Sequence, residues 1–392
     1  MPHVAPFRGL RYDPAVAGEL SHLTTPPYDV ISEPTRHRYR EASPFNAVHV
    51  DLPDGVDDPE DPENRYARAG ALLSSWEQSG ALVRPDEPCY YGYEVAWRAP
   101  DRTAMRLRGV FVALTLEPWG GSVIPHEHTM AGPVEDRLRL LRATATHLSP
   151  IYGTVPGPCG PLAALLERTS AQPPVEELLD EEGVTHRLWE IPGAEPIDAW
   201  LRDDELLIAD GHHRYTTALG YRDERRAVDG AGPWDAILAF IVDAGSETVP
   251  VLPYHRVQLA GDALVPTRPA ADLDDVQAHV SDESLVVGVI ARRDGLVPGY
   301  GLLDLHGSPP AVRALHEERL DAAAPGDALR FTHDAADAER AVLAGDAVAA
   351  YVLPSTTPAR VLAAIEHGDR LPRKSTFFWP KPRTGLLFMP VR

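Results

Sequence analysis

The pattern of apolar and polar positions divides the first two thirds of the chain into short strands and amphipathic helices. Alternating or continuous apolar runs predict strands at Cys89–Trp97, Leu107–Leu116, Trp234–Val242 and Thr248–Val257, the last two feeding a central sheet. Helical spacing predicts helices at Tyr66–Gly80, Glu135–Thr146, Leu162–Arg168 and Pro196–Leu201. Asp- and Pro-rich composition predicts an exposed loop over Asp51–Asn64 and a surface connector over Pro173–Glu182.

The remaining third alternates more regularly between the two kinds of element. We predict strands at Leu285–Ala291, Gly301–Leu305 and Ala347–Leu353, a final strand at Thr384–Met389, and helices at Ala311–Ala323, Ala335–Ala344 and Pro358–His367. The pattern therefore predicts a mixed α/β (α+β) protein, with a body over residues 1–265 and an α/β lobe over residues 266–392.

The most informative segment follows the apolar run Leu206–Ala209, where Asp210 and Gly211 predict a sharp turn into a helix. His212, His213 and Arg214 crowd this turn. Free N–H groups at a helix start favour anions, and an arginine there can grip phosphate in a bidentate manner. A purely structural alternative has Asp210 as the N-cap with the histidines and Arg214 exposed.

Composition narrows the classes of function. The 392 residues carry a formal net charge of −21, which argues against nonspecific binding to nucleic acid or anionic membranes. The N-terminus lacks a secretion signal, no apolar run reaches membrane-spanning length, and two cysteines are too few for a disulfide framework. We therefore expect a cytoplasmic protein.

Lysine is confined to one short segment of the chain. Lys374 and Lys381 are the only lysines among 37 basic residues, and Ser375 and Thr376 follow the first of them. The lysine ammonium is a compact charge, whereas the arginine guanidinium is a planar fork. We therefore expect that a lysine ammonium of this segment acts at a functional site. A chance placement is the alternative.

Three further segments carry candidate chemistry. His126 and His128 would share a face and could bind a metal if the strand is extended, whereas a polar loop is the alternative. A strand carrying His255 and Arg256 implies a ligand or an inter-strand salt bridge. Asp29, in the rigid turn Pro26–Val30, is either a turn cap or a base.

Five ordered segments together resemble the bacterial and archaeal domain-of-unknown-function family 1015 (DUF1015). They are Pro26–Val30, Pro125–Thr129 with Asp136 and Arg137, Ala209–Arg214, Pro253–Arg256, and Lys374–Lys381 with Thr384 and Gly385. The Asp-Gly-His-His-Arg segment is in addition similar to the turn of the ParB/sulfiredoxin-like fold, which binds nucleotide phosphates in relatives that include free-serine kinases. The resemblance implies a ParB/sulfiredoxin-like core with an N-terminal elaboration.

The residues and the resemblance together imply a nucleotide-dependent phosphotransferase acting on a small hydroxyl-bearing metabolite similar to free serine, with Mg²⁺ and ATP or ADP. The expected catalytic residues are Asp29, Glu127, Asp210, His212 and His213. The expected phosphate- or nucleotide-binding residues are Gly211, Arg214, His255, Arg256, Lys374, Ser375, Thr376 and Lys381. The expected metal ligands are Asp210, Glu127 and His126.

Two other functions fit the same residues. A hydrolase would use His126, His128, His212, His213 and Asp210 around Zn²⁺ or Mn²⁺. A nonenzymatic nucleotide-binding switch would bind without turnover. We expect a small-molecule substrate and a nucleotide as binding partners, and we expect binding to neither nucleic acid nor a membrane. A homodimer is one assembly that the chain could form.

Overall fold

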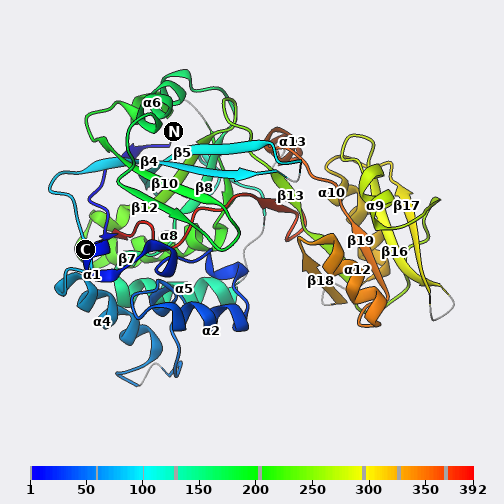
Figure 1. The fold of residues 1–392 in the computed structure, drawn as a ribbon, viewed down its shortest axis with the longest axis horizontal. Helices are drawn as coiled ribbons and strands as arrows, with labels where there is room; N and C mark the ends of the chain where they lie inside the picture. The colour runs from blue at the N-terminus through cyan, green and yellow to red at the C-terminus, as the bar shows by residue number, and fades with distance from the viewer. Residues whose placement is uncertain are drawn as a thin grey trace. The chain divides into compact units, whose positions relative to one another are not determined.

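The computed structural model describes residues 2–58, 61–99, 101–127, 131–201, 205–293, 297–324, 328–365 and 370–392. These form a mixed α/β protein of two compact units, coloured along the chain in Figure 1. The first unit holds Met1–Pro125, Thr129–Thr248 and Pro380–Arg392, and the second holds His126–His128 and Val249–Trp379.

A nine-stranded mixed sheet organises the first unit in the order β6-β11-β8-β12-β5-β4-β10-β9, with β1 paired to β5. Its strands are β1 (Val4–Ala5), β4 (Cys89–Arg98), β5 (Ala104–Thr115), β6 (Val123–Pro125), β8 (Ile151–Val155), β9 (Glu176–Leu179), β10 (Thr185–Pro192), β11 (Leu206–Asp210) and β12 (Ala236–Asp243). Two small ladders join β2 (Arg11–Tyr12) to β3 (Leu82–Val83) and β7 (Thr146–His147) to β21 (Met389–Pro390).

The helices of the first unit are α1 (Pro14–Ala17), α2 (Glu33–Ala42), α3 (Val48–Asp51), α4 (Arg65–Gln78), α5 (Ala131–Thr144), α6 (Gly160–Ser170), α7 (Ile197–Leu201) and α8 (His212–Asp229), with 3₁₀ turns at Leu20–His22, Tyr28–Val30 and Pro233–Asp235. Five of these helices, α4 to α8, overlap the predicted helical segments, whereas α1 to α3 follow none of them. Helix α5 packs against both α4 and α8. Apolar residues of α6 and α8 share one buried cluster with Ala239 and Ile241 of β12.

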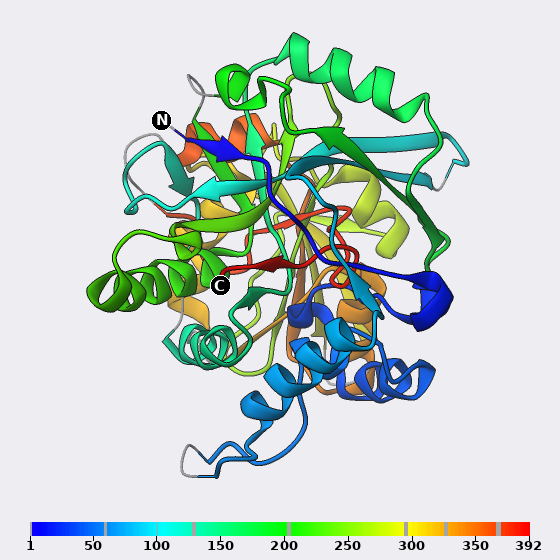
Figure 2. The same cartoon turned by 90° about the vertical axis from the view of Figure 1, so that its left-hand side faces the viewer.

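The opposite face of this sheet receives the end of the chain. Phe240 alternates with Ala239 and Ile241 along β12, so its ring points to that opposite face, where it contacts the Tyr93 ring. The backbone N–H of Arg383 donates to the Tyr93 hydroxyl at 3.4 Å. The final segment therefore lies over this face, and Figure 2 shows it in red beside the blue N-terminal segment, where Leu10 and Phe388 pair.

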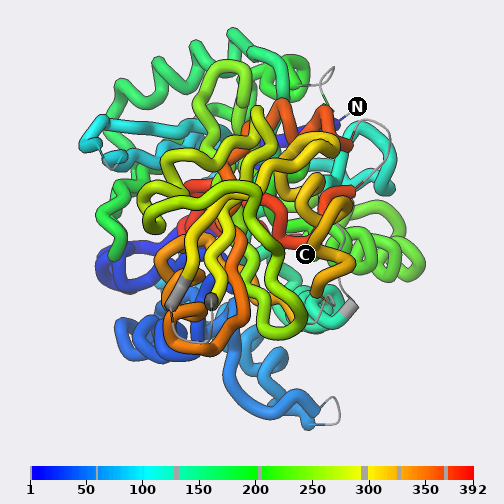
Figure 3. Tube along the Cα trace, turned by 90° about the vertical axis from the view of Figure 1, so that its right-hand side faces the viewer, coloured from blue at the N-terminus to red at the C-terminus, as the bar shows by residue number. Residues whose placement is uncertain are grey.

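The second unit is built on a six-stranded antiparallel sheet in the order β15-β17-β16-β19-β14-β18. Figure 3 shows the Cα trace with the strands of this sheet toward the viewer. Its strands are β14 (His255–Gln258), β15 (Arg268–Ala270), β16 (Val286–Arg293), β17 (Val297–Asp304), β18 (Leu329–Thr332) and β19 (Ala349–Val352), and β13 (Val251–Pro253) pairs with β20 (Thr376–Phe378) apart from them. Its helices are α9 (Leu273–His279), α10 (Ala311–Leu315) with a π turn at His316–Leu320, α11 (Asp321–Ala323), α12 (Ala335–Ala344) and α13 (Pro358–Ile365).

Both faces of this second sheet are covered. Val287 and Val289 pack with the α10 region, whereas Ile290 packs with α9 and α12. Alternate residues of β16 thus serve two separate cores, which gives three layers.

The element predictions were wrong in four places. Thr248–Val257 forms two strands instead of one, and neither belongs to the large sheet. Pro173–Glu182 contains strand β9. Thr384–Met389 is mostly irregular, with only Met389 in a strand. Asp51, placed in an exposed loop, ends α3 and is 3% exposed. The division of the chain at residues 265 and 266 remains a prediction, as does the ParB/sulfiredoxin-like assignment of the core.

Candidate functional site

The predicted strand-turn-helix is present and positions Asp210. Strand β11 lies between β6 and β8, and its register with β8 shifts between Ile208 and Asp210. Gly211 follows with φ +94°, a left-handed conformation that favours glycine, and helix α8 starts at His212. Gly211, not Asp210, is the N-cap. The structural alternative of an Asp210 cap is therefore wrong, and its carboxylate faces other groups.

Those groups are two cations and a second carboxylate. Lys381 donates from Nζ to Asp210 Oδ1 at 2.5 Å and to Asp29 Oδ2 at 3.2 Å. Arg214, one helical turn after Asp210, pairs with Asp210 Oδ2 and also donates to the Pro150 carbonyl. The Lys381 side chain is only 6% exposed, against 17% and 26% for the Asp210 and Asp29 side chains. We call Asp29, Asp210, Arg214 and Lys381 the acid–lysine cluster.

The neighbouring histidines lie in the first turn of α8. His212 is buried and His213 is half-buried. No acidic residue occupies this first turn, so the backbone N–H groups and the Arg214 guanidinium place donors at the helix start, where Asp210 pairs with Arg214. The catalytic roles expected of both histidines remain predictions.

A small cavity borders the acid–lysine cluster. Its volume is about 40 Å³, and its polar lining comes from Tyr28, Asp51, Arg137, Thr146, His147, Ser149, Arg214 and Thr217. Burial raises the pKa of Tyr28 to about 12, so its hydroxyl stays protonated at neutral pH. Burial also raises the pKa of Asp51, against the opposing effect of the Arg137 and Arg214 charges. Sequence reasoning assigned no site role to Tyr28, Asp51, Arg137 or Ser149.

The other predicted site residues lie in the second unit, where Glu127 organises the lysine-containing segment. The Glu127 carboxylate accepts from the backbone N–H groups of Lys374 at 3.1 Å and Ser375 at 3.0 Å, and from that of Thr376 at 3.3 Å. Lys374 has φ +55°, and such a left-handed residue lets successive N–H groups converge on one anion. The Glu127 carboxylate occupies that position here.

His126 and Arg256 support the same segment from two sides. His126 Nε2 lies 2.6 Å from Thr376 Oγ1. Arg256 is fully buried and donates to the Lys374 carbonyl at 2.6 Å and to the Arg373 carbonyl at 3.3 Å. Burial lowers the pKa of Arg256 to about 9. Within the described part of the chain no carboxylate pairs with this guanidinium, so the predicted inter-strand salt bridge is wrong.

His255 is buried beside Arg256 and accepts from the Leu353 N–H at Nδ1, 3.0 Å away. The predicted anion-binding role of His255 and Arg256, like that of Lys374, Ser375 and Thr376, remains a prediction. His128 lies outside the described residues.

A metal centre built from three or more protein ligands gains no geometric support. Among the described residues, no group of three or more His, Cys, Asp or Glu side chains could hold a metal ion. The predicted ligands fall in both units, Asp210 in the first and His126 and Glu127 in the second. The Zn²⁺ or Mn²⁺ hydrolase therefore stays a prediction. No described helix is long and apolar enough to cross a membrane.

Comparison with known proteins identifies the family. The model of a protein family of unknown function, DUF1015, matches residues 4–287, well over half of the chain. The chain belongs to the DUF1015 family. This agrees with the resemblance of the five ordered segments. No curated protein matches the chain.

Solved structures show only a distant likeness. A free serine kinase in complex with AMP has a TM-score of 0.39 and 13% identity, covering 72% of this chain and 91% of that one. A mutant free serine kinase in complex with ADP has a TM-score of 0.38 and 14% identity. That match covers 72% of this chain and 92% of the other chain. A conserved hypothetical protein from Pyrococcus furiosus has a TM-score of 0.33 and 14% identity. That match covers 70% of this chain and 91% of the other chain. Function must therefore be argued from this chain's own residues.

Proposed function

We propose that this DUF1015 protein is a nucleotide-dependent phosphotransferase that acts on a small hydroxyl-bearing metabolite similar to free serine. The observation that carries the proposal is the acid–lysine cluster, in which Lys381 contacts both Asp29 and Asp210 at the start of α8. Phosphoryl transfer needs positioned cations for the phosphate and an oriented acceptor hydroxyl, with no covalent protein intermediate. The cluster supplies the cations, and its carboxylates supply acceptors that could orient the hydroxyl, all within one unit.

Each member of the cluster has a distinct role in this proposal. Lys381 and Arg214 neutralise phosphate charge, and the N–H groups at the start of α8 add donors. Asp210 or Asp29 accepts the proton of the acceptor hydroxyl. Without a ligand, the carboxylates and the cations satisfy each other, which stabilises the charges in a half-buried position.

The two carboxylates also fit Mg²⁺, which is commonly bound through one or two carboxylates together with substrate phosphates. Asp29 and Asp210 are hard oxygen donors already gathered around one cation, the Lys381 ammonium. Bound there with a nucleotide, Mg²⁺ would neutralise phosphate charge.

The test combines nucleotide binding with turnover on the full-length protein. Mg²⁺ with ATP or ADP should raise the melting temperature, and a panel of small hydroxyl acceptors, serine first, should release ADP from ATP. Asp210→Asn should lower kcat/KM by about 10² to 10⁴, the range for a lost general base. Asp223→Asn, on the exposed side of the same helix, is the matched control and should keep full activity.

Two results would count against the proposal. If no nucleotide stabilises the wild-type protein, the phosphotransferase assignment fails. If nucleotides bind and no acceptor supports ADP release, the protein is the nonenzymatic nucleotide-binding switch.

A further inference from the structure

The cavity of about 40 Å³ adjoins the acid–lysine cluster, with which it shares one residue and a chain neighbour of another. Arg214 belongs to both, because it pairs with Asp210 and lines the cavity. Tyr28 lines the cavity, and the next residue, Asp29, contacts Lys381. A molecule whose head group fills the cavity would therefore have its other end near the proposed base.

The cavity is small and charged. A water molecule needs roughly 10–15 Å³ of such space, so the cavity has room equivalent to about three or four water molecules. This is far too little for a nucleotide and suits the head group of a small metabolite. Asp51 supplies a buried carboxylate, and Arg214 supplies a guanidinium.

One oxygen of Asp51 has capacity for another donor. Asp51 Oδ1 accepts from Arg137 at 3.1 Å, whereas the contact of Oδ2 is the Ser149 hydroxyl at 3.4 Å, a long hydrogen bond. Leaving such a buried carboxylate oxygen poorly satisfied is costly, and an ammonium group would satisfy it.

Arg214 has donors to spare as well. Two of its nitrogens donate to Pro150 and Asp210, while a guanidinium carries five N–H groups in all. A ligand carboxylate in the cavity can therefore be bound without breaking either contact.

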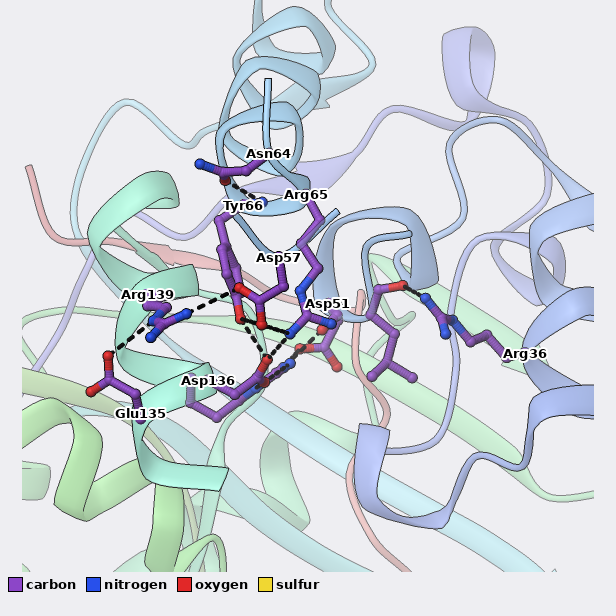
Figure 4. Close-up of polar contacts among 11 residues, drawn as sticks. Arg36, Asp51, Asp57, Asn64, Arg65, Tyr66, Glu135, Asp136 and Arg139 are labelled. Carbon is purple, nitrogen blue, oxygen red and sulfur yellow. Dashed lines mark hydrogen bonds and ion pairs between the residues drawn. The ribbon is translucent and has the colours of Figure 1, made fainter. Parts of the chain in front are cut away.

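The Asp51 part of the lining is held by a network of ion pairs and hydrogen bonds, which Figure 4 shows around Asp51 and Asp136. Arg137 donates from Nε to Asp136 at 2.8 Å, and its guanidinium lies 4.3 Å from the centre of the Tyr28 ring. Asp136 in turn accepts from Arg65 at 2.8 Å and from Tyr66 at 2.9 Å. Arg137 is thus committed to protein partners, and the network fixes Asp51 in place.

We infer that this cavity is the acceptor pocket and selects a zwitterionic head group, with Asp51 binding the ammonium and Arg214 the carboxylate of a small hydroxy amino acid. The inference rests on the proposed function for the reacting end of the molecule, and it adds the place where the head group binds and the residues that recognise its two charges. Asp51 and Ser149 are then specificity-determining residues, not catalytic ones.

The test uses three molecules that differ in the head group: L-serine, 3-hydroxypropionate, which lacks the ammonium, and ethanolamine, which lacks the carboxylate. Calorimetry on the full-length protein with ADP and Mg²⁺ should show L-serine binding at least tenfold more tightly than either analogue. In Asp51→Asn, L-serine and 3-hydroxypropionate should differ by less than about threefold. Asp57→Asn, in the outer network of Figure 4 and outside the cavity lining, should keep the wild-type preference.

Ser149→Ala is the second variant, for the case that Asp51→Asn does not fold; because Asp51 Oδ2 then loses the Ser149 donor, the preference for the ammonium should increase. Equal binding of L-serine and 3-hydroxypropionate to the wild type, no binding of any of the three, or a preference unchanged in Asp51→Asn would overturn the inference. Serine binding that depends on Asp51 without ADP release would overturn the phosphotransferase and leave the pocket intact. ADP release with either truncated analogue at the rate seen with serine would overturn the selectivity of the pocket and leave the phosphotransferase intact.

Discussion

The two lysines illustrate what residue usage can and cannot predict. Their rarity predicted an ammonium role, and Lys381 does lie between Asp29 and Asp210. The Lys374 ammonium instead lies 5.0 Å from the centre of the Tyr254 ring, while its backbone N–H binds Glu127. Two identical side chains seven positions apart thus have different surroundings, because contacts made by residues far away in the sequence decide what each charge meets.

Replacing Lys381 by methionine tests its place in the cluster. Lys381→Met leaves Asp29 and Asp210 facing each other without their shared cation, so we expect a loss of about 1–3 kcal/mol in the free energy of unfolding. Loss of phosphate neutralisation should lower kcat/KM at least 100-fold. Arg392→Met removes a more exposed cation from the same C-terminal segment, and it should cost at most about 1 kcal/mol.

Urea denaturation and steady-state kinetics measure the two effects. Lys381→Arg should recover stability more than activity, because a guanidinium keeps the charge and changes its shape. Full activity in Lys381→Met would remove Lys381 from the proposed machinery.

The residues of the cavity show where single-residue prediction fails. Asp51 stands at the start of an Asp- and Pro-rich stretch, which predicted exposure. Its burial depends on Arg137, 86 positions later, and on Ser149, 98 positions later. No local pattern encodes that pairing.

At the scale of elements, the apolar run, the Asp-Gly turn and the helical spacing after it were enough to predict β11 and α8. The break at Tyr254 between β13 and β14 was missed because the apolar and β-branched residues were given more weight than Pro253, which directly precedes the break. The two strands separate because β13 pairs with β20 and β14 pairs with β18 and β19. Those partners lie 71 or more positions further along the chain.

The turn between β11 and α8 makes a prediction of its own. Gly211→Ala must adopt φ +94°, and its Cβ would meet Ile151 Cγ2 at 3.0 Å and the Arg214 guanidinium at 3.2 Å. Left-handed strain alone costs about 1 kcal/mol or more, and the contact with Arg214 disturbs the acid–lysine cluster as well. We expect reduced stability together with a loss of activity of at least tenfold.

Gly230→Ala is the matched control at the other end of α8. Its φ of +75° is also positive, and nothing lies within 4 Å of the added Cβ. It should lower the melting temperature without changing kcat/KM. Equal kinetic effects from both substitutions would mean that backbone strain, not the displaced Arg214, accounts for the loss.

At the scale of the whole molecule, the sequence predicted one composite site from segments in both halves of the chain. The fold assigns Asp210, Arg214, Lys381 and Asp29 to the first unit, and Glu127, Arg256 and Lys374 to the second. Lys381 belongs to the first unit because the chain returns there after Trp379. Local periodicity contains no information on such a return, so the grouping of site residues required the tertiary structure.

Each unit also contains a buried histidine that stays neutral, which predicts acid sensitivity in both. Burial lowers the pKa of His147 and of His255 to about 4. The unfolded chain has a histidine pKa of about 6.5 and binds more protons between these values, so stability is complete above about pH 6.5 and falls until about pH 4. Each histidine should contribute up to about 3 kcal/mol to the free energy of unfolding, at about 1.4 kcal/mol per pKa unit.

Urea denaturation at pH 7.5 and at pH 4.5 tests this prediction. In His147→Gln and in His255→Gln, the free energy of unfolding should differ less between the two pH values than it does in the wild type. His37→Gln, at an exposed position, should match the wild type. An unchanged difference in both buried variants would show that carboxylates, not histidines, govern acid unfolding.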